Sequence, residues 1–155
     1  MSKAKEFKNL GHKTVYPSKP NKTILEVFKN SYPNSLYLVP LVCNEFTAIC
    51  PVTGQPDFAK LEIVYVPRID MVESKSLKLY LHSFRNEGIF HEEVINRIFN
   101  DLWEKMDPRF MRVIGDFSVR GGISIKPLIQ KIAADVNKEE VLMLLQSWDN
   151  SKHRL

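Results

Sequence analysis

Alternation of apolar and polar residues predicts two β-strands in the first half of the chain. From Phe58 to Val66, apolar and charged side chains fall on opposite faces, which is the pattern of a strand with one buried face. The apolar positions are Leu61, Ile63 and Tyr65, and the charged ones are Lys60 and Glu62. The run from Leu36 to Cys43 is apolar and β-prone. A loop that contains Cys50 joins the two expected strands.

The next segment changes to helical periodicity. Apolar residues recur every three or four positions in two stretches, which predicts two amphipathic helices. The first stretch has Leu77, Leu81 and Phe84, and the second has Val94, Ile98, Leu102 and Met106. Asn86-Glu87-Gly88 separates the helices, and Asp107-Pro108 ends the second.

Two further strands and a last helix are expected after this pair. The strands run over Phe110–Val119 and Ile123–Lys126, around a turn at Gly121-Gly122. Helical spacing of Val141, Leu142 and Leu145 predicts a C-terminal helix from Lys138 to Trp148. The core order is therefore ββααββ, an α+β fold with an antiparallel sheet.

The two ends of the chain extend this core. Residues 1–34 are polar and contain Pro17, Pro20 and Pro33, so we expect an N-terminal arm with one short helix from Thr23 to Phe28. Residues 127–155 form a C-terminal extension. No repeat, low-complexity tract or linker divides the 155 residues, so residues 1–155 are expected to form a single domain.

The expected sheet would leave one face and both edges uncovered. Unpaired edges invite association, and proteins usually pair or block them. Several copies could close edge to edge into a ring, so the pattern predicts an oligomer.

Composition limits the classes of function. The net charge is +4 and the pI is about 9.0, but acidic and basic residues are interspersed, so the charge gives little support for a nucleic-acid partner. No apolar run approaches the roughly 20 residues of a membrane span, and the first residues lack a secretory signal pattern. Cys43 and Cys50 do not suggest a disulfide framework. We expect a soluble, cytoplasmic protein.

The loop after the first strand contains a thiol and, seven residues later, a carboxylate. A Cys50 thiolate could add to an electrophilic carbon, and Asp57 could give a proton to the atom that gathers negative charge. Each residue also has an ordinary interpretation. Cys50 could be a small buried hydrophobe, and Asp57 could be a turn residue before a strand.

The segment Glu73-Ser74-Lys75-Ser76-Leu77-Lys78-Leu79-Tyr80 opens the first helix. Serine can cap the free amides there, and the same amides attract anions. Lys75 and Lys78 lie on neighbouring positions of one helical face and could hold a phosphate. Arg120, before Gly121-Gly122, could add a second contact. A solvated helix start and a plain hairpin turn are the alternatives.

His91-Glu92 begins the second helix. The Glu92 carboxylate could accept two parallel hydrogen bonds from the N–H edge of a base such as guanine. An acidic residue in the first turn of a helix is also simply common.

The sequence lacks the usual metal and nucleotide motifs. Neither cysteine has a CxxC or HxxxH companion, so zinc would have to recruit scattered histidines, and we expect no metal. Those histidines are His12, His82, His91 and His153. No GxGxxG or Walker pattern exists, so a nucleotide cofactor must bind outside those folds.

Taken together, these stretches resemble the NADPH-dependent 7-cyano-7-deazaguanine reductases of the queuosine pathway, in their short single-module form. The similarity runs from Thr23 to Lys126, and residues 73–80 match the diagnostic family motif throughout. The family is similar to GTP cyclohydrolase I in its tunnelling fold, whose ββααββ subunits close into a ring-shaped barrel. The resemblance implies a homodecamer of two stacked pentamers, with no membrane or direct nucleic-acid partner.

The resemblance also implies roles for individual residues. Cys50 falls at the position of the nucleophile and Asp57 at that of the proton donor. The positions that hold the deazaguanine are Val72, Glu73, Ser74, His91 and Glu92. Those that would face the NADPH phosphates are Lys75, Lys78 and Arg120. The stretch after Lys126 matches no family pattern.

The implied reaction reduces the nitrile of 7-cyano-7-deazaguanine to the primary amine of 7-aminomethyl-7-deazaguanine, through a Cys50 thioimide. An imine formed on the way would hydrolyse in water, so the site must close. Two other functions stay open. A pterin or purine cyclohydrolase of the same fold would need zinc or another water-activating set, and a basic RNA-binding module would lose affinity steeply as salt rises.

Overall fold

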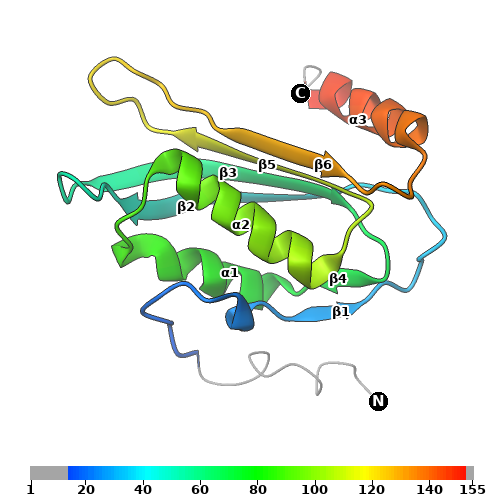
Figure 1. Cartoon of the computed structure of the whole chain (residues 1–155), viewed down its shortest axis with the longest axis horizontal. Coiled ribbons are helices and arrows are strands. Elements are labelled where there is room, and N and C mark those ends of the chain that lie inside the picture. Colours follow the sequence, from blue (N-terminus) through cyan, green and yellow to red (C-terminus); the bar gives the residue numbers. More distant parts are fainter. Residues whose placement is uncertain (1–13, 153–155) are drawn as a thin grey trace.

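The computed structural model describes residues 14–152. Its main sheet has four antiparallel strands in the order β2-β3-β5-β6, and two helices cover one face (Figure 1). The elements of this unit are β2 (Val39–Ile49), β3 (Pro56–Val66), α1 (Ser74–His82), α2 (His91–Met106), β5 (Phe110–Phe117) and β6 (Leu128–Ile132). Their order confirms the predicted ββααββ arrangement and the α+β class.

Smaller elements surround this unit. They are the 3-10 helices η2 (Lys22–Ile24) and η3 (Ser83–Asn86), the strands β1 (Val27–Lys29) and β4 (Asp70–Val72), and α3 (Lys138–Lys152). The prediction of a helix from Thr23 to Phe28 is wrong. A single turn capped by Asn21 ends at Ile24, and β1, which pairs with β4, begins at Val27. Leu25 between them is 2% exposed. The segment from Ile24 to Val27 of the expected arm thus packs against the folded core.

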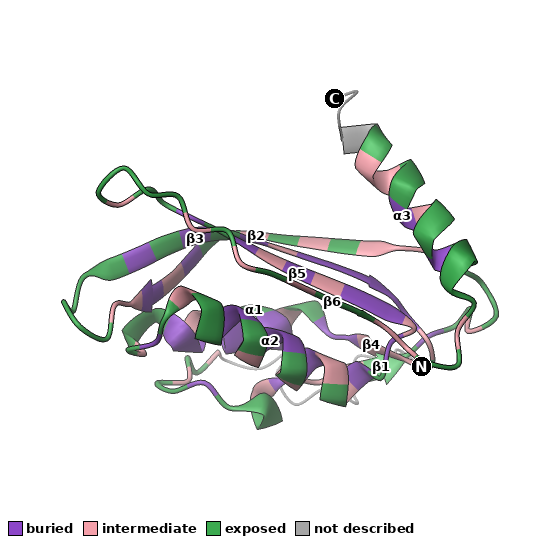
Figure 2. Cartoon of the chain, turned by 45° about the horizontal axis from the view of Figure 1, so that its top comes forward, coloured by how far each residue is buried: buried purple, intermediate pink, exposed green. Residues whose placement is uncertain are grey.

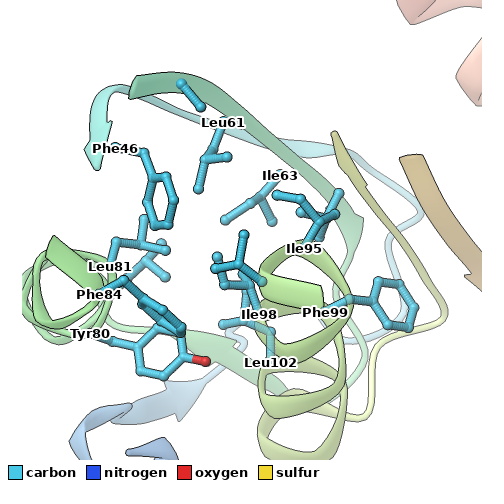
Figure 3. Packing of buried hydrophobic residues seen from close by; sticks show 14 of the residues in the cluster. Phe46, Leu61, Ile63, Tyr80, Leu81, Phe84, Ile95, Ile98, Phe99 and Leu102 are labelled. Carbon is cyan, nitrogen blue, oxygen red and sulfur yellow. The ribbon is translucent and has the colours of Figure 1, made fainter. Parts of the chain in front are cut away.

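The core lies between the sheet and the two helices. Leu61 and Ile63 of β3 point toward Phe84, after α1, and toward Ile98 of α2 (Figure 3). Burial of each such aliphatic side chain contributes about 1.5–3 kcal/mol. At Gly115 of β5, an added Cβ would lie 2.6 Å from Ile95 Cδ1. The missing side chain therefore lets α2 approach the sheet closely.

A β-bulge interrupts β2 and explains why its predicted end was wrong. The pairing with β3 shifts between Cys43 and Phe46, so that two residues face one. Before the bulge, the odd-numbered residues of β2 face the helices. After the bulge, the even-numbered residues Phe46 and Ala48 face them, and each is 1% exposed. This change of phase breaks the alternation on which the prediction of a strand ending at Cys43 depended.

The last strand also differs from the prediction. Gly121 and Gly122 form the expected two-residue turn, with φ of 55° and 80°, and Arg120 and Ile123 exchange backbone hydrogen bonds across it. The strand expected over Ile123–Lys126 is wrong, because regular pairing with β5 begins at Leu128. Pro127 has no N–H to donate, so a regular ladder starts only after it.

The C-terminal helix α3 confirms the predicted helix and occupies the opposite face of the sheet. It lies at one end of that face, away from α1 and α2 (Figure 2). Val141 and Leu145 are buried there against Val66 and Phe110. The face that was expected to be uncovered is therefore covered at this end.

Candidate active site

Cys50 directly follows β2, at the start of the loop that leads to β3. Its N–H donates to the Gln55 carbonyl at 2.9 Å, and its carbonyl accepts from the Gly54 N–H at 2.9 Å. The preceding residue, Ile49, exchanges backbone bonds with Glu87 and Ile89, at 2.9 and 3.0 Å. These contacts fix the thiol beside the segment that leads into α2.

Hydrogen bonds lower the pKa of the Cys50 thiol from its ordinary value of 9.0 to about 7. The largest cause is the Thr53 hydroxyl, followed by the backbone N–H groups of Thr53 and Val52, while desolvation and the charge of Asp57 act in the opposite sense. The nucleophilic form of cysteine is the thiolate, which this loop makes abundant near neutral pH. Cys50 is also partly exposed. Cys50 is therefore not the fully buried small hydrophobe of the alternative interpretation, and its role as a nucleophile stays a prediction.

Asp57 lies inside β3 rather than in a turn, so that alternative is wrong. It is paired with Ala48, next to the loop that contains Cys50. Its side chain is 4% exposed and lies between the imidazole of His91 and the guanidinium of Arg120. Oδ2 is 3.2 Å from His91 Nε2, and Oδ1 is 3.0 Å from Arg120 Nη1. A carboxyl group that is desolvated and close to a thiol has the position that a proton donor needs.

His91 is the first residue of α2, as predicted, and its ring packs on Phe117 with centroids 4.1 Å apart. Its Nε2 is buried and makes no hydrogen bond of good geometry, although Asp57 is near. The pair is thus an ion pair when the imidazole is protonated. Glu92 follows on the exposed first turn of α2, where its carboxylate is free to meet a ligand.

Arg120 extends from the glycine turn toward the Cys50 loop. Besides its ion pair with Asp57, its Nη2 donates to the Pro56 carbonyl at 3.0 Å. In this chain the guanidinium therefore contacts the candidate proton donor. The expectation that Arg120 faces a cofactor phosphate stays a prediction.

A second set of predicted residues lies at the start of α1. Val72 ends β4, and Glu73 caps the helix: its carboxylate accepts from the N–H groups of Lys75 at 2.8 Å and Ser76 at 2.7 Å. The expectation that serine provides this cap is wrong, because the longer Glu73 side chain reaches both amides. Ser74 and Lys78 line a groove between α1 and β2 of about 340 Å³.

The two sets lie at opposite ends of α1. The Cys50 set is beside Glu87–Ile89, beyond the C-terminal end of the helix, and the Glu73 set is at its N-terminal end (Figure 1). The nine residues of α1 alone span about 13 Å. One chain does not bring all the predicted site residues together.

Sequence reasoning missed Thr53 and Phe117. Thr53 lies within the Cys50 loop, but only the fold aims its hydroxyl at the thiol. Within residues 14–152, no three His, Cys, Asp or Glu side chains gather as metal ligands would. No helix in the same range is long and apolar enough to cross a membrane.

Comparisons with known proteins identify a family. A family model described as QueF-like protein matches residues 56–136. The expectation that no family pattern continues after Lys126 is therefore wrong for residues 127–136. An NADPH-dependent 7-cyano-7-deazaguanine reductase of Neisseria meningitidis serogroup B is 56% identical over 115 residues, which cover 74% of this chain and 73% of the relative. A protein of the same name from Helicobacter pylori is 52% identical over 124 residues, 80% and 85% of the two chains.

Among solved structures, an archaeosine synthase QueF-Like in the apo form is similar, with a TM-score of 0.58 and 22% sequence identity. The match covers 63% of this chain and 95% of that one. At this identity the likeness supports the fold alone.

Proposed function

Because this chain belongs to the QueF-like protein family, we propose that it uses NADPH to reduce the nitrile of 7-cyano-7-deazaguanine to the primary amine of 7-aminomethyl-7-deazaguanine, in queuosine tRNA modification. One observation supports this reaction most directly. The Cys50 thiol, with its pKa near 7, lies beside the buried Asp57. A nitrile is a poor acceptor of hydride, and a nucleophile next to an acid converts it into a better one.

The first step uses both residues. The Cys50 thiolate forms a carbon–sulfur bond with the nitrile carbon, and Asp57 gives a proton to the nitrogen. The triple bond becomes a double bond, and the product is a covalent thioimide.

The later steps return the enzyme to its starting state. NADPH, when bound, supplies the hydride for each of the two reductions. Cys50 leaves as a thiolate after the first, which gives an imine. Two protons must reach the substrate nitrogen over the whole reaction, and the Asp57–His91 pair lies where the chain can deliver them. Both described cysteines are free thiols, which fits a reducing cytoplasm.

The chain offers groups that suit both ligands. The exposed carboxylate of Glu92 suits the N–H edge of the deazaguanine, and His91 lies beside it. Val72, Glu73 and Ser74 would hold the same base at the other end of α1. Lys75 and Lys78, on the first turns of α1, suit the cofactor phosphates, since their cationic side chains attract anions.

A complete site then requires more than one copy. The two sets of residues lie at opposite ends of α1, and the edge strands β2 and β6 have no partner within the described chain. A ring that pairs β2 of one copy with β6 of the next would cover these edges and bring half-sites from two chains together. We propose a homodecamer of two pentamers in which the subunit interfaces exclude water from the imine.

NADPH oxidation, followed by absorbance with and without 7-cyano-7-deazaguanine, tests the activity. We expect two NADPH consumed per nitrile and none without it. Turnover that depends on bound zinc would support a cyclohydrolase instead, and tRNA binding that weakens steeply with salt would support the RNA-binding module.

Subunit complementation tests the shared site. Cys50→Ala and Lys75→Ala proteins are mixed, dissociated and reassembled, and activity is measured at low NADPH. If Cys50 and Lys75 of different copies meet in one site, about a quarter of the sites in random rings carry both native residues. Mixtures with no more activity than the separate variants would contradict a shared site.

A further inference from the structure

The groove between α1 and the edge strand β2 has a basic wall of which the reaction described above uses only Lys78. Lys78, His82 and Arg85 line it, and their spacings of four and three residues put them on one side of α1 and its continuation into η3. Ser74, one turn before Lys78, lies at the other end of the same groove. The wall extends for about 16 Å between Ser74 and Arg85.

The positive charge of this wall is not neutralised by the chain. Lys78 and Arg85 make no ion pair with any side chain that the structure describes. The pKa of His82 is lowered, mainly by burial and further by the charges of Arg85 and Lys78, so these two cations act on the same region of the groove. Among the residues that line the groove Glu45 alone is acidic, and it pairs with none of them. Like charges gathered on one helical face are unfavourable without an anion.

The floor of the groove is apolar. It is formed by Leu41, Phe46, Ile63, Leu77 and Leu81. An apolar floor with a cationic rim suits a flat heteroaromatic ring joined to a phosphate, because the ring buries apolar area while the rim binds the charge.

Building on the proposed reductase function, we propose that this groove binds the adenosine 2′-phosphate end of NADPH and that Arg85 selects NADPH over NADH. The two cofactors differ by this phosphate, and a guanidinium can bind it through two parallel hydrogen bonds. Lys78 adds a second charge on the same wall. The reactive end of the cofactor then lies toward Ser74, beside residues 72–75, and the adenosine end lies toward Arg85.

Binding of adenosine 2′,5′-bisphosphate, compared with adenosine 5′-monophosphate, tests the site by calorimetry without any turnover. Arg85→Gln should weaken binding of the bisphosphate about 10- to 100-fold, since a charge-assisted hydrogen bond is lost, and should change binding of the monophosphate less than about 2-fold. Lys78→Gln should act in the same direction, and Arg85→Lys should restore part of the affinity. Lys60→Gln, exposed on the opposite face of the sheet, is the control that removes the same charge.

The preference between cofactors gives a second measurement. Arg85→Gln should lower kcat/KM for NADPH and leave that for NADH nearly unchanged. If Arg85→Gln and Lys78→Gln both keep the wild-type preference for NADPH over NADH, the assignment is overturned. It is also overturned if the variants lose their oligomeric assembly but still bind the bisphosphate, since the groove would then be a subunit contact. A wild-type protein that binds the bisphosphate through Arg85 but does not reduce the nitrile would contradict the reductase function alone.

Discussion

Replacement of Thr53 by valine should raise the pKa of the Cys50 thiol. The Thr53 hydroxyl is the largest of three hydrogen-bonding causes that lower this pKa from 9.0 to about 7. Valine has nearly the same shape but no hydroxyl. The loop should therefore keep its backbone bonds while the thiolate loses its best donor.

The size of the effect follows from the same numbers. The three hydrogen bonds lower the pKa by about 2 even though burial and the charge of Asp57 raise it. The largest of the three, from the Thr53 hydroxyl, therefore lowers the pKa by at least about 0.7. At pH 7 about half of the wild-type thiol is ionised, and after the substitution at most about one sixth would be. Alkylation of Cys50 at pH 7 should thus slow at least about threefold, and its midpoint should move to higher pH.

The pKa of the Cys50 thiol is measured from the rate of iodoacetamide alkylation as a function of pH. The measurement uses a Cys43→Ala background, so that Cys50 is the thiol that reacts. Thr53→Ser should keep the wild-type midpoint, and Thr47→Val, at a threonine within β2, should not change it. If Thr53→Val titrates like the wild type, the hydroxyl does not stabilise the thiolate, and the reasoning on the loop is refuted.

Four further outcomes are expected. Cys50→Ser should abolish both turnover and the mass increase of the intact protein after mixing with the nitrile, because a hydroxyl is a poor nucleophile; an adduct that persists would remove Cys50 as nucleophile. Asp57→Asn should leave the assembly intact by light scattering but slow adduct formation in stopped-flow absorbance, and wild-type rates at every pH would make Asp57 a structural residue. Glu92→Gln should weaken binding of the nitrile more than binding of NADPH, and Lys75→Ala should weaken binding of NADPH more. If each variant weakens the binding of both ligands equally, the nitrile and NADPH do not have separate binding regions. Gly115→Ala should lower the stability to urea by about 1–3 kcal/mol, since its Cβ would lie 2.6 Å from Ile95, and an unchanged midpoint would show that Ile95 repacks freely.

The sequence predicted the elements whose pattern follows one period without interruption. Alternation in β3 and the helical spacing of α2 each depend on one buried face, so local pattern and final structure agree. The predictions failed where tertiary contacts decide. Val27–Lys29 is extended because β4 pairs with it, and β6 begins after Pro127 because only there can the ladder with β5 form.

The sequence suggested the candidate residues but not their arrangement. Residue type suggested Cys50 and Asp57, and the family resemblance added His91; their roles stay predictions. Nothing in their order along the chain indicates that Arg120 lies against Asp57. The separation of the Glu73 set from the Cys50 set likewise depends on the direction of α1, which a residue pattern does not contain. Contacts between distant segments supply this information.

The bulge in β2 contains one residue more than a regular ladder needs. Deletion of Asn44 or Glu45 would leave a single residue opposite Lys60, so Phe46 and Ala48 would still face the helices and Cys50 would keep its place beside Asp57. Deletion of both residues would pair Phe46 with Lys60, turn Phe46 and Ala48 to the outside and draw Cys50 back by one residue, about 3.4 Å. The segment between Cys43 and Cys50 can therefore lose one residue, whereas the loss of two would move the thiol away from its acid.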